Sequence, residues 1–313
     1  MIRHLHPTDS PSLLQFKQAA GPDEVFTLAE ALKGNRRSFP LVKYTSVALS
    51  PRAWQSCWVQ TRRTRVRCLL RAGPRSGPEA WEVSQLYLAK GLTDEAWDVL
   101  EQIATPAGRS GARRVFVRLP AESPLYEQAR MAGYEHAYSE SVYRAASAAS
   151  VVAKTGVSEE GISMEPLDDD GRYGLFRLYC SATPVGVRAK AGQTLDEWLA
   201  AEENPARKPR DWVLHGGNGS LEAHVRTGNF AGGRFFSVMC SRNAPCGYEQ
   251  LVAAGASDGG DNPVFTAVPA YNDSFGMVLE SLGFTQTGTY DVLVKTLAVR
   301  VSRPVGAVMA AGS

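Results

Sequence analysis

The same sequence pattern occurs twice in the chain, about 150 residues apart. In the middle, Val115-Phe116 precedes a helical stretch that closes on Gly133-Tyr134, which begins 18 residues later. Near the end, Val264-Phe265 precedes a helical stretch that closes on Gly283-Phe284, which begins 19 residues later. Solenoid units repeat every ~20–50 residues. The longer spacing therefore indicates a duplicated domain.

The duplication predicts the organisation of the chain. We expect a first domain at residues 1–145, a linker at 146–160, a second domain at 161–300 and a tail at 301–313. Of the 313 residues, 44% are hydrophobic and 21% are charged. Each half is therefore large and apolar enough to bury a core of its own.

Hydrophobic periodicity predicts the same order of elements in both halves: strand, helix, three strands, helix, strand, helix, strand. The fourth strand is expected to end at Leu88 in the first half and at Cys240 in the second. A helical region is predicted over 12–32, and a strand is predicted to start at Trp212. The fold class is α/β, of the α+β kind, with a mixed, mostly antiparallel sheet flanked by helices in each half.

Several classes of protein are disfavoured. Residues 1–6 have no apolar core of a signal peptide, and no run of about 18 apolar residues occurs, so we expect no membrane partner. Five scattered cysteines without CxxC spacing indicate reduced thiols in a cytoplasmic protein, and no zinc or other metal site. These are Cys57, Cys68, Cys180, Cys240 and Cys246.

Charge is divided unevenly between the halves. Residues 1–150 carry 20 Lys and Arg against 14 Asp and Glu (+6), whereas residues 151–313 carry 14 against 18 (−4). Arginines gather between Arg62 and Arg75, without the aromatic platform or motif that nucleic-acid binding requires. The simplest interpretation is a strand with one solvated face; an anion-binding wall and a contact with the acidic half are the alternatives.

The repeated order and the Gly-aromatic pair after the last helix resemble the GNAT acyltransferase fold, here as a tandem pair. The most specific part is Asn272–Phe284, in which Asn272 lies eleven residues before Gly283, as in the penultimate helix of that family. The resemblance implies splayed fourth and fifth strands. It also implies a cosubstrate, acetyl-CoA or another acyl-CoA, and a small-molecule amine as the acceptor.

In the family, a loop after the fourth strand presents backbone N–H groups at a helix N-terminus to the pyrophosphate of CoA. In the second half this loop corresponds to Asn243–Tyr248, and the pantetheine arm to Val238–Cys240. The resemblance thus implies these cofactor-binding residues: Val238, Met239, Cys240, Arg242, Asn243, Ala244, Cys246, Gly247, Tyr248 and Asn272. Cys246 can equally be a small residue that fills a tight turn.

The corresponding loop of the first half is Gly91–Ala96. Thr93 is expected to cap a helix there, with Asp94 and Glu95 in its first turn. Two carboxylates would repel a pyrophosphate at close range. The first half is therefore expected not to bind CoA.

The family's general acid, a Tyr, is replaced by Leu279 in the second half and by Ala129 in the first. Acyl transfer is therefore expected to be slow on generic amines. Glu222 and His224 are two apart on one strand, so they share a face and are candidates for the general base. A solvated strand face explains both residues as well.

Three functions remain open. The first is an N-acyltransferase with its site in the second half. The second is a GNAT-fold protein that has lost acyl transfer and binds a small molecule or a partner in the old cleft. The third is an enzyme of altered chemistry in that cleft. The chain is expected to be a monomer or a homodimer without nucleic acid.

Overall fold

The computed structural model describes residues 2–34, 37–48, 56–63, 65–157, 164–168 and 171–298. Its strands are β1 (Ile2–His4), β2 (Cys57–Arg62), β3 (Arg65–Pro74), β4 (Ala80–Leu88), β5 (Arg114–Pro120), β6 (Glu135–Ala145), β7 (Glu165–Pro166), β8 (Arg207–His215), β9 (Leu221–Phe230), β10 (Gly233–Cys240), β11 (Val264–Pro269) and β12 (Thr285–Thr296).

The helices are α1 (Ser10–Ala19), α2 (Leu28–Ala31), α3 (Leu41–Ala48), α4 (Ala96–Gln102), α5 (Ala104–Arg109), α6 (Leu125–Met131), α7 (Ala148–Thr155), α8 (Arg172–Ala182), α9 (Val185–Ala191), α10 (Leu195–Ala201), α11 (Tyr248–Ala256) and α12 (Asp273–Ser281). None of the helices in the described ranges has the length and apolar character needed to cross a bilayer.

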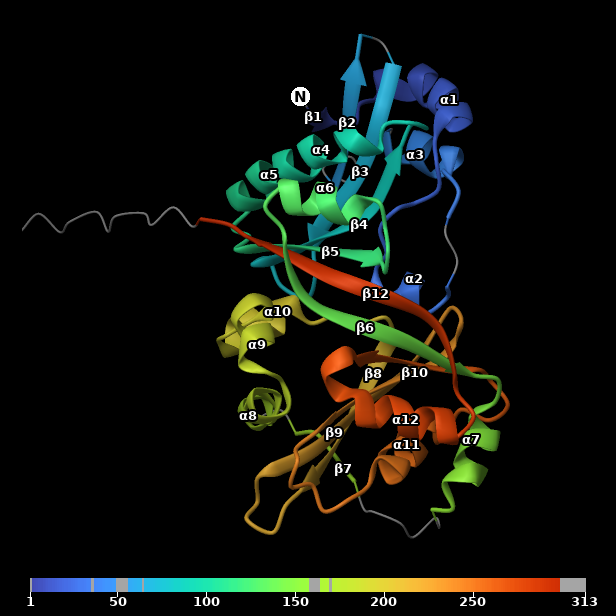
Figure 1. The fold of residues 1–313 in the computed structure, drawn as a ribbon, viewed down its shortest axis with the longest axis vertical. Coiled ribbons are helices and arrows are strands. Elements are labelled where there is room, and N and C mark those ends of the chain that lie inside the picture. Colours follow the sequence, from blue (N-terminus) through green and yellow to red (C-terminus); the bar gives the residue numbers. More distant parts are fainter. Residues whose placement is uncertain are drawn as a thin grey trace, which may run out of the picture.

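The twelve strands of the described residues form one sheet, in which the repeats exchange their last strands. The order is β1-β2-β3-β4-β5-β12-β6-β11-β10-β9-β8-β7. Hence β12 of the second repeat pairs with β5 of the first, and β6 of the first pairs with β11 of the second. The two exchanged strands run side by side through the middle of the molecule (Figure 1).

The two repeats are related by an approximate two-fold axis between β6 and β12. From either edge of the sheet, the first five strands of one repeat follow in sequence order, and the last strand of the other repeat comes next. The exchange also carries a residue of the second repeat into the core of the first, where Leu293 of β12 is fully buried beside α4 and α6. The boundaries at residues 145 and 161 stay a prediction about folding units, because the repeats share one sheet.

The splay between the fourth and fifth strands is confirmed in both repeats. β4 pairs in parallel with β5 only over Ala80–Glu82, and β10 pairs with β11 only at Arg234 and Phe235. Both fourth strands end where the sequence predicts, at Leu88 and Cys240. Beyond the paired residues the strands diverge, which opens a gap in each half of the sheet.

One face of β3 is buried, as the alternation predicts, and the face that carries the arginines is partly solvated, except at Leu69. Cys68 and Leu70 point into the core under α4, whereas Leu69 between them points into the core under α1 and α3, and all three are buried. Two arginines of the basic cluster have acidic partners instead of solvent. Arg67 pairs with Glu95 within the first repeat, and Arg75 pairs with Glu203 of the second.

Other elements differ from the sequence prediction. The helical region predicted over 12–32 is two helices, α1 and α2, with non-helical chain at 20–27 between them, where Gly21-Pro22 ends the helical pattern. The predicted linker contains α7, whose first turn Ser147 caps by accepting a hydrogen bond from the Ser150 amide. Thr93 does not cap α4, because residues 93–95 form a 3₁₀ turn instead.

Candidate functional site

The splay of the second repeat holds a cleft of about 620 Å³. Its walls come from β9, β10, the start of α11, the residues around Asn272, and the helical segment α8–α10. Six of the ten predicted cofactor-binding residues line it: Val238, Met239, Cys240, Arg242, Tyr248 and Asn272.

The remaining predicted cofactor residues lie at the loop before α11. Asn243 lines a different cavity, and Cys246 packs half-buried against the cluster of Ala223, Val225 and Leu251. The Gly247 amide donates to Gln250 Oε1 at 3.0 Å, so the side chain of Gln250 satisfies one donor that a pyrophosphate would use. The first residue of α11 is held in place by its side chain. The Tyr248 hydroxyl donates a hydrogen bond to Asn272 Oδ1 at 2.7 Å, and its ring packs on Phe275.

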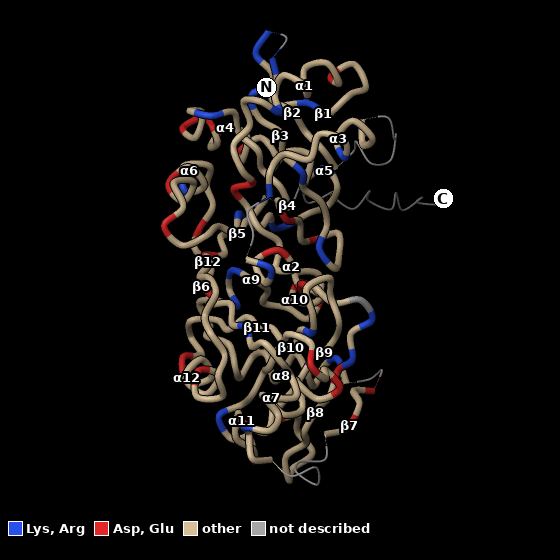
Figure 2. Tube along the Cα trace, turned by 90° about the vertical axis from the view of Figure 1, so that its right-hand side faces the viewer, with Lys and Arg blue, Asp and Glu red and all other residues tan. Residues whose placement is uncertain are grey.

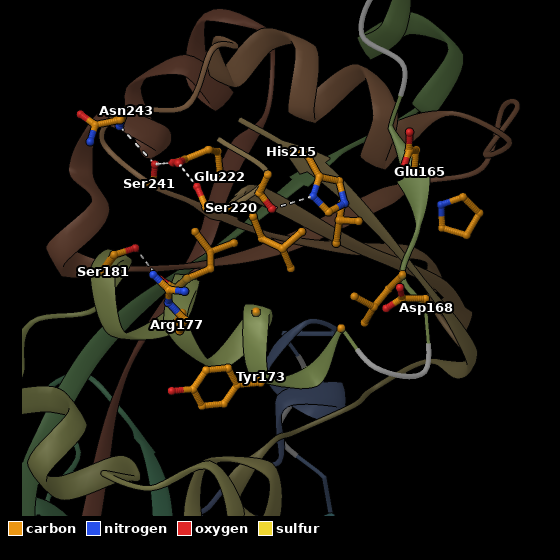
Figure 3. Close-up of a pocket in the computed structure, with 18 residues that line it drawn as sticks. Glu165, Asp168, Tyr173, Arg177, Ser181, His215, Ser220, Glu222, Ser241 and Asn243 are labelled. Carbon is orange, nitrogen blue, oxygen red and sulfur yellow. Dashed lines mark hydrogen bonds between the residues drawn. The ribbon is translucent and has the colours of Figure 1, made fainter. Parts of the chain in front are cut away.

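The two predicted catalytic residues face different spaces. His224 is buried, at 6% exposure, and lines the cleft. Glu222 lines a separate cavity of about 490 Å³ against α8, where its carboxylate accepts hydrogen bonds from Ser220 and Ser241 (Figure 3). The Glu222–His224 pair that their spacing suggested is not formed. His224 bonds across the hairpin to Asp211 instead.

Asp211 connects two groups of the cleft. Its Oδ1 lies 2.7 Å from His224 Nε2 and accepts a 2.7 Å hydrogen bond from Arg226 Nε. Burial alone would raise the pKa of Asp211, but the hydrogen bonds from His224 and Arg226 outweigh it and lower that pKa to about 2. The carboxylate therefore stays ionised and fixes the ring of His224.

The depressed pKa gives a pH-dependent prediction. Since the folded-state pKa of Asp211 is about 2 against an ordinary 3.8, the carboxylate stabilises the fold above pH 4, and this contribution is lost as the pH falls towards 2. A shift of this size corresponds to ~2 kcal/mol. Urea unfolding of Asp211→Asn and the wild type should differ most above pH 5 and converge near pH 2. A difference that stays constant with pH would contradict the role of the charge.

A tyrosine close to Asn272 in the sequence lines the cleft and is a candidate proton donor. Leu279, at the family's Tyr position, is fully buried in the core and does not line the cleft. Tyr290 is buried as well, and its hydroxyl reaches the Ala31 carbonyl oxygen at 3.4 Å. Tyr271 does line the cleft; burial, opposed by a hydrogen bond with Thr183, raises its pKa. Of these two tyrosines, Tyr271 is thus the one that lines the cleft.

The corresponding gap of the first repeat is filled by its own chain. Residues 20–26 run between β4 and β5: the Gly21 amide donates to Leu88 O (2.8 Å), the Glu24 amide to Leu86 O (3.1 Å) and the Phe26 amide to Arg118 O (3.0 Å). Asp23 accepts from the Leu86 amide at 2.9 Å and is 1% exposed. The β4 backbone is therefore already hydrogen-bonded where a pantetheine arm would lie.

No sequence pattern points to the residues that the helical segment α8–α10 and the chain after it bring to the cleft, notably Tyr179, Trp198, Glu202 and Glu203. The sequence did not point to Asp211 either, because the strand was predicted to start at Trp212 whereas β8 begins at Arg207. Within the described residues, no group of three or more His, Cys, Asp or Glu side chains is placed to hold a metal ion.

No protein-family model matches the chain. No curated protein matches it either. The fold of the chain does match solved structures. A GCN5-related N-acetyltransferase from Sphaerobacter thermophilus aligns at 14% identity over 95% of both chains, with a TM-score of 0.53. A conserved protein of unknown function from Staphylococcus epidermidis aligns at 12% identity over 77% of this chain and 94% of its own, with a TM-score of 0.53.

A Drosophila protein aligns at 14% identity over 95% of this chain and 98% of its own, with a TM-score of 0.50. At such identities the likeness shows the fold and not the reaction. The chain therefore has the GNAT fold that its sequence resembles, and it has it over nearly its whole length.

Proposed function

We propose that the chain is an acyl-CoA-dependent N-acyltransferase acting on a small-molecule amine, with its one working cleft in the second repeat. The observation that carries the proposal is the contrast between the two splays. The second is an open cleft lined by six of the predicted cofactor residues, whereas the first is occupied by residues 20–26. A pantetheine arm would run along Val238–Cys240, and acetyl-CoA is the simplest donor.

Arg242 would hold the phosphates at the cleft mouth, together with backbone N–H groups at the start of α11. Thioester and amine would meet near His224. With Nε2 of His224 donating a hydrogen bond to Asp211, Nδ1 of His224 would be left to accept the proton that the amine loses. Tyr271 would return a proton to the departing thiolate. The five free cysteines accord with a cytoplasmic site of action.

The test is release of free CoA thiol from acetyl-CoA by the purified full-length chain across a panel of primary amines. We expect amine-dependent release, slow on generic amines, with the acetylated amine detected by mass spectrometry in equal amount. No release with any amine would refute acyl transfer. It would favour the alternatives, a binding protein or an enzyme of other chemistry in the same cleft.

A further inference from the structure

A smaller cavity, of about 220 Å³, lies next to the cleft and between the two repeats. Six residues line both spaces: Tyr179, Trp198, Glu202, Glu203, Pro269 and Tyr271. The other residues of the smaller space come from α9, α10 and the first repeat. Figures 1 and 2 show α2 and α9–α10 in the band between the two halves. We call this space the inter-repeat cavity.

The chain that follows α10 ties the second repeat to the first at this cavity. Glu203 accepts hydrogen bonds from Arg118 at 2.7 and 2.9 Å and pairs with Arg75 at 2.7 Å. Glu202 pairs with Arg226 of its own repeat at 3.2 Å. The first repeat therefore forms a fixed wall of the cavity.

The charges around the cavity and the cleft are paired within the protein. Four arginines and three carboxylates line the two spaces, and each carboxylate has an arginine partner; Glu140 pairs with Arg118. The remaining arginine, Arg242, stands at the cofactor loop. Burial raises the pKa of Glu203, but Arg118 and Arg75 outweigh burial and hold that pKa at about 2. A charged group of a ligand would therefore lose its hydration in the inter-repeat cavity without gaining a partner.

Ring side chains make up much of the remaining wall. Of the fifteen residues that line the inter-repeat cavity, five are charged, five are aliphatic and five are aromatic: Phe116, Tyr138, Tyr179, Trp198 and Tyr271. Tyr179 and Trp198 stack with their centroids 5.3 Å apart, and the Arg75 guanidinium covers one face of Phe116 at 3.9 Å. Aromatic rings attract one another beyond the area that they bury, in offset-stacked and edge-to-face arrangements. The lining thus favours an uncharged ring.

We propose that the acceptor is an amine that carries an uncharged aromatic ring. The ring binds in the inter-repeat cavity, and the amino group reaches past Tyr271 into the cleft. The proposal rests on the proposed acyl transfer. In that step the amine nitrogen forms a bond to the acyl carbon and gives up one proton, the C–S bond breaks, and the CoA thiolate takes up a proton. The first repeat, whose own gap is filled, then serves as a wall of the acceptor site.

Calorimetry on the full chain, with and without saturating CoA, tests this with three amines: 2-phenylethylamine, butylamine and 1,4-diaminobutane. Butylamine lacks the ring, and the diamine places a second charge where the ring would lie. We expect 2-phenylethylamine to bind at least tenfold more tightly than either of the others. A smaller preference, tighter binding of the diamine, or no binding of 2-phenylethylamine in either condition would overturn the inference.

A ring supplied by the protein itself tests the position of the ligand's ring. Ala191 of α9 lines the inter-repeat cavity, so Ala191→Phe should fill part of it and weaken binding of 2-phenylethylamine at least tenfold. Ala189 is exposed on the same helix and lines neither space, so Ala189→Phe should leave binding unchanged. Full-strength binding by a folded Ala191→Phe variant would also overturn the inference. If that variant proves unstable, the comparison of the three amines on the wild type still decides.

A separate titration with acetyl-CoA distinguishes failure of this inference from failure of the proposed function. Acetyl-CoA binding without a preference for 2-phenylethylamine removes the inference and leaves the proposed function. A preference for 2-phenylethylamine without acetyl-CoA binding keeps the ring site and removes acyl transfer.

Discussion

Ending the chain after Phe284, which removes β12, is expected to abolish folding of both repeats. β12 lies between β5 and β6 in the middle of the sheet, and its loss leaves two open strand edges there. It buries Tyr290, Val292, Leu293 and Val294, each at 5% exposure or less. At ~1.5–3 kcal/mol for each buried side chain, their loss approaches the whole stability of a typical domain, about 5–15 kcal/mol.

Circular dichroism and thermal melts of the truncated chain measure this effect. The matched control ends after residue 298, which keeps all of β12 and should melt as the full chain does. A chain ending at Phe284 that keeps a cooperative transition and near-native ellipticity would show that each repeat closes its own sheet. The strand exchange would then not be needed for folding.

His224→Gln is expected to lower kcat/KM for acyl transfer by about 10²–10⁴-fold, the usual contribution of a general acid or base. The effect should fall on kcat, because the role proposed for His224 is to accept a proton from the amine and not to bind the cofactor. The substitution changes a buried contact with Asp211 and no predicted cofactor residue. The affinity for acetyl-CoA should therefore change little.

Glu222→Gln is the matched control, since Glu222 lies two residues away on β9 but faces the other cavity (Figure 3). It should retain activity within a few-fold of the wild type. Undiminished turnover by His224→Gln would remove His224 from the mechanism. A loss confined to Glu222→Gln would show that the other member of the predicted pair accepts the proton.

The sequence contained the fold but not its exchange of strands. The two copies of the Val-Phe and Gly-aromatic pattern were enough to predict the order of elements and the ends of β4 and β10. Antiparallel last strands with the same alternating pattern fit either repeat, so local pattern cannot show that β12 pairs with β5. Likewise Gly21-Pro22 signals the end of a helix, but not that the chain then enters the gap beside β4.

The sequence predicted those site residues whose positions depend only on neighbouring elements of the chain. Val238–Cys240, Arg242 and Tyr248 could be placed by counting back from the helix that follows them, and Asn272 by its distance from Gly283, and they do line the cleft. The partners of His224 and the far wall depend on long-range contacts. Asp211 lies across a hairpin, and Glu203 comes from the second repeat to pair with Arg118 of the first. The spacing of residues along the sequence does not predict these long-range contacts.

Calorimetric titration of acetyl-CoA into the wild type, Arg242→Glu and Lys90→Glu tests the central claim most directly. Arg242 and Lys90 are both exposed and both stand two residues after the end of their fourth strand, so they are counterparts in the two repeats. We predict one site per chain. Reversing the charge of Arg242 should weaken binding at least tenfold, ~1.4 kcal/mol, and Lys90→Glu should leave it unchanged. No binding by the wild type, or binding that depends on Lys90 and not on Arg242, would contradict a working cleft in the second repeat.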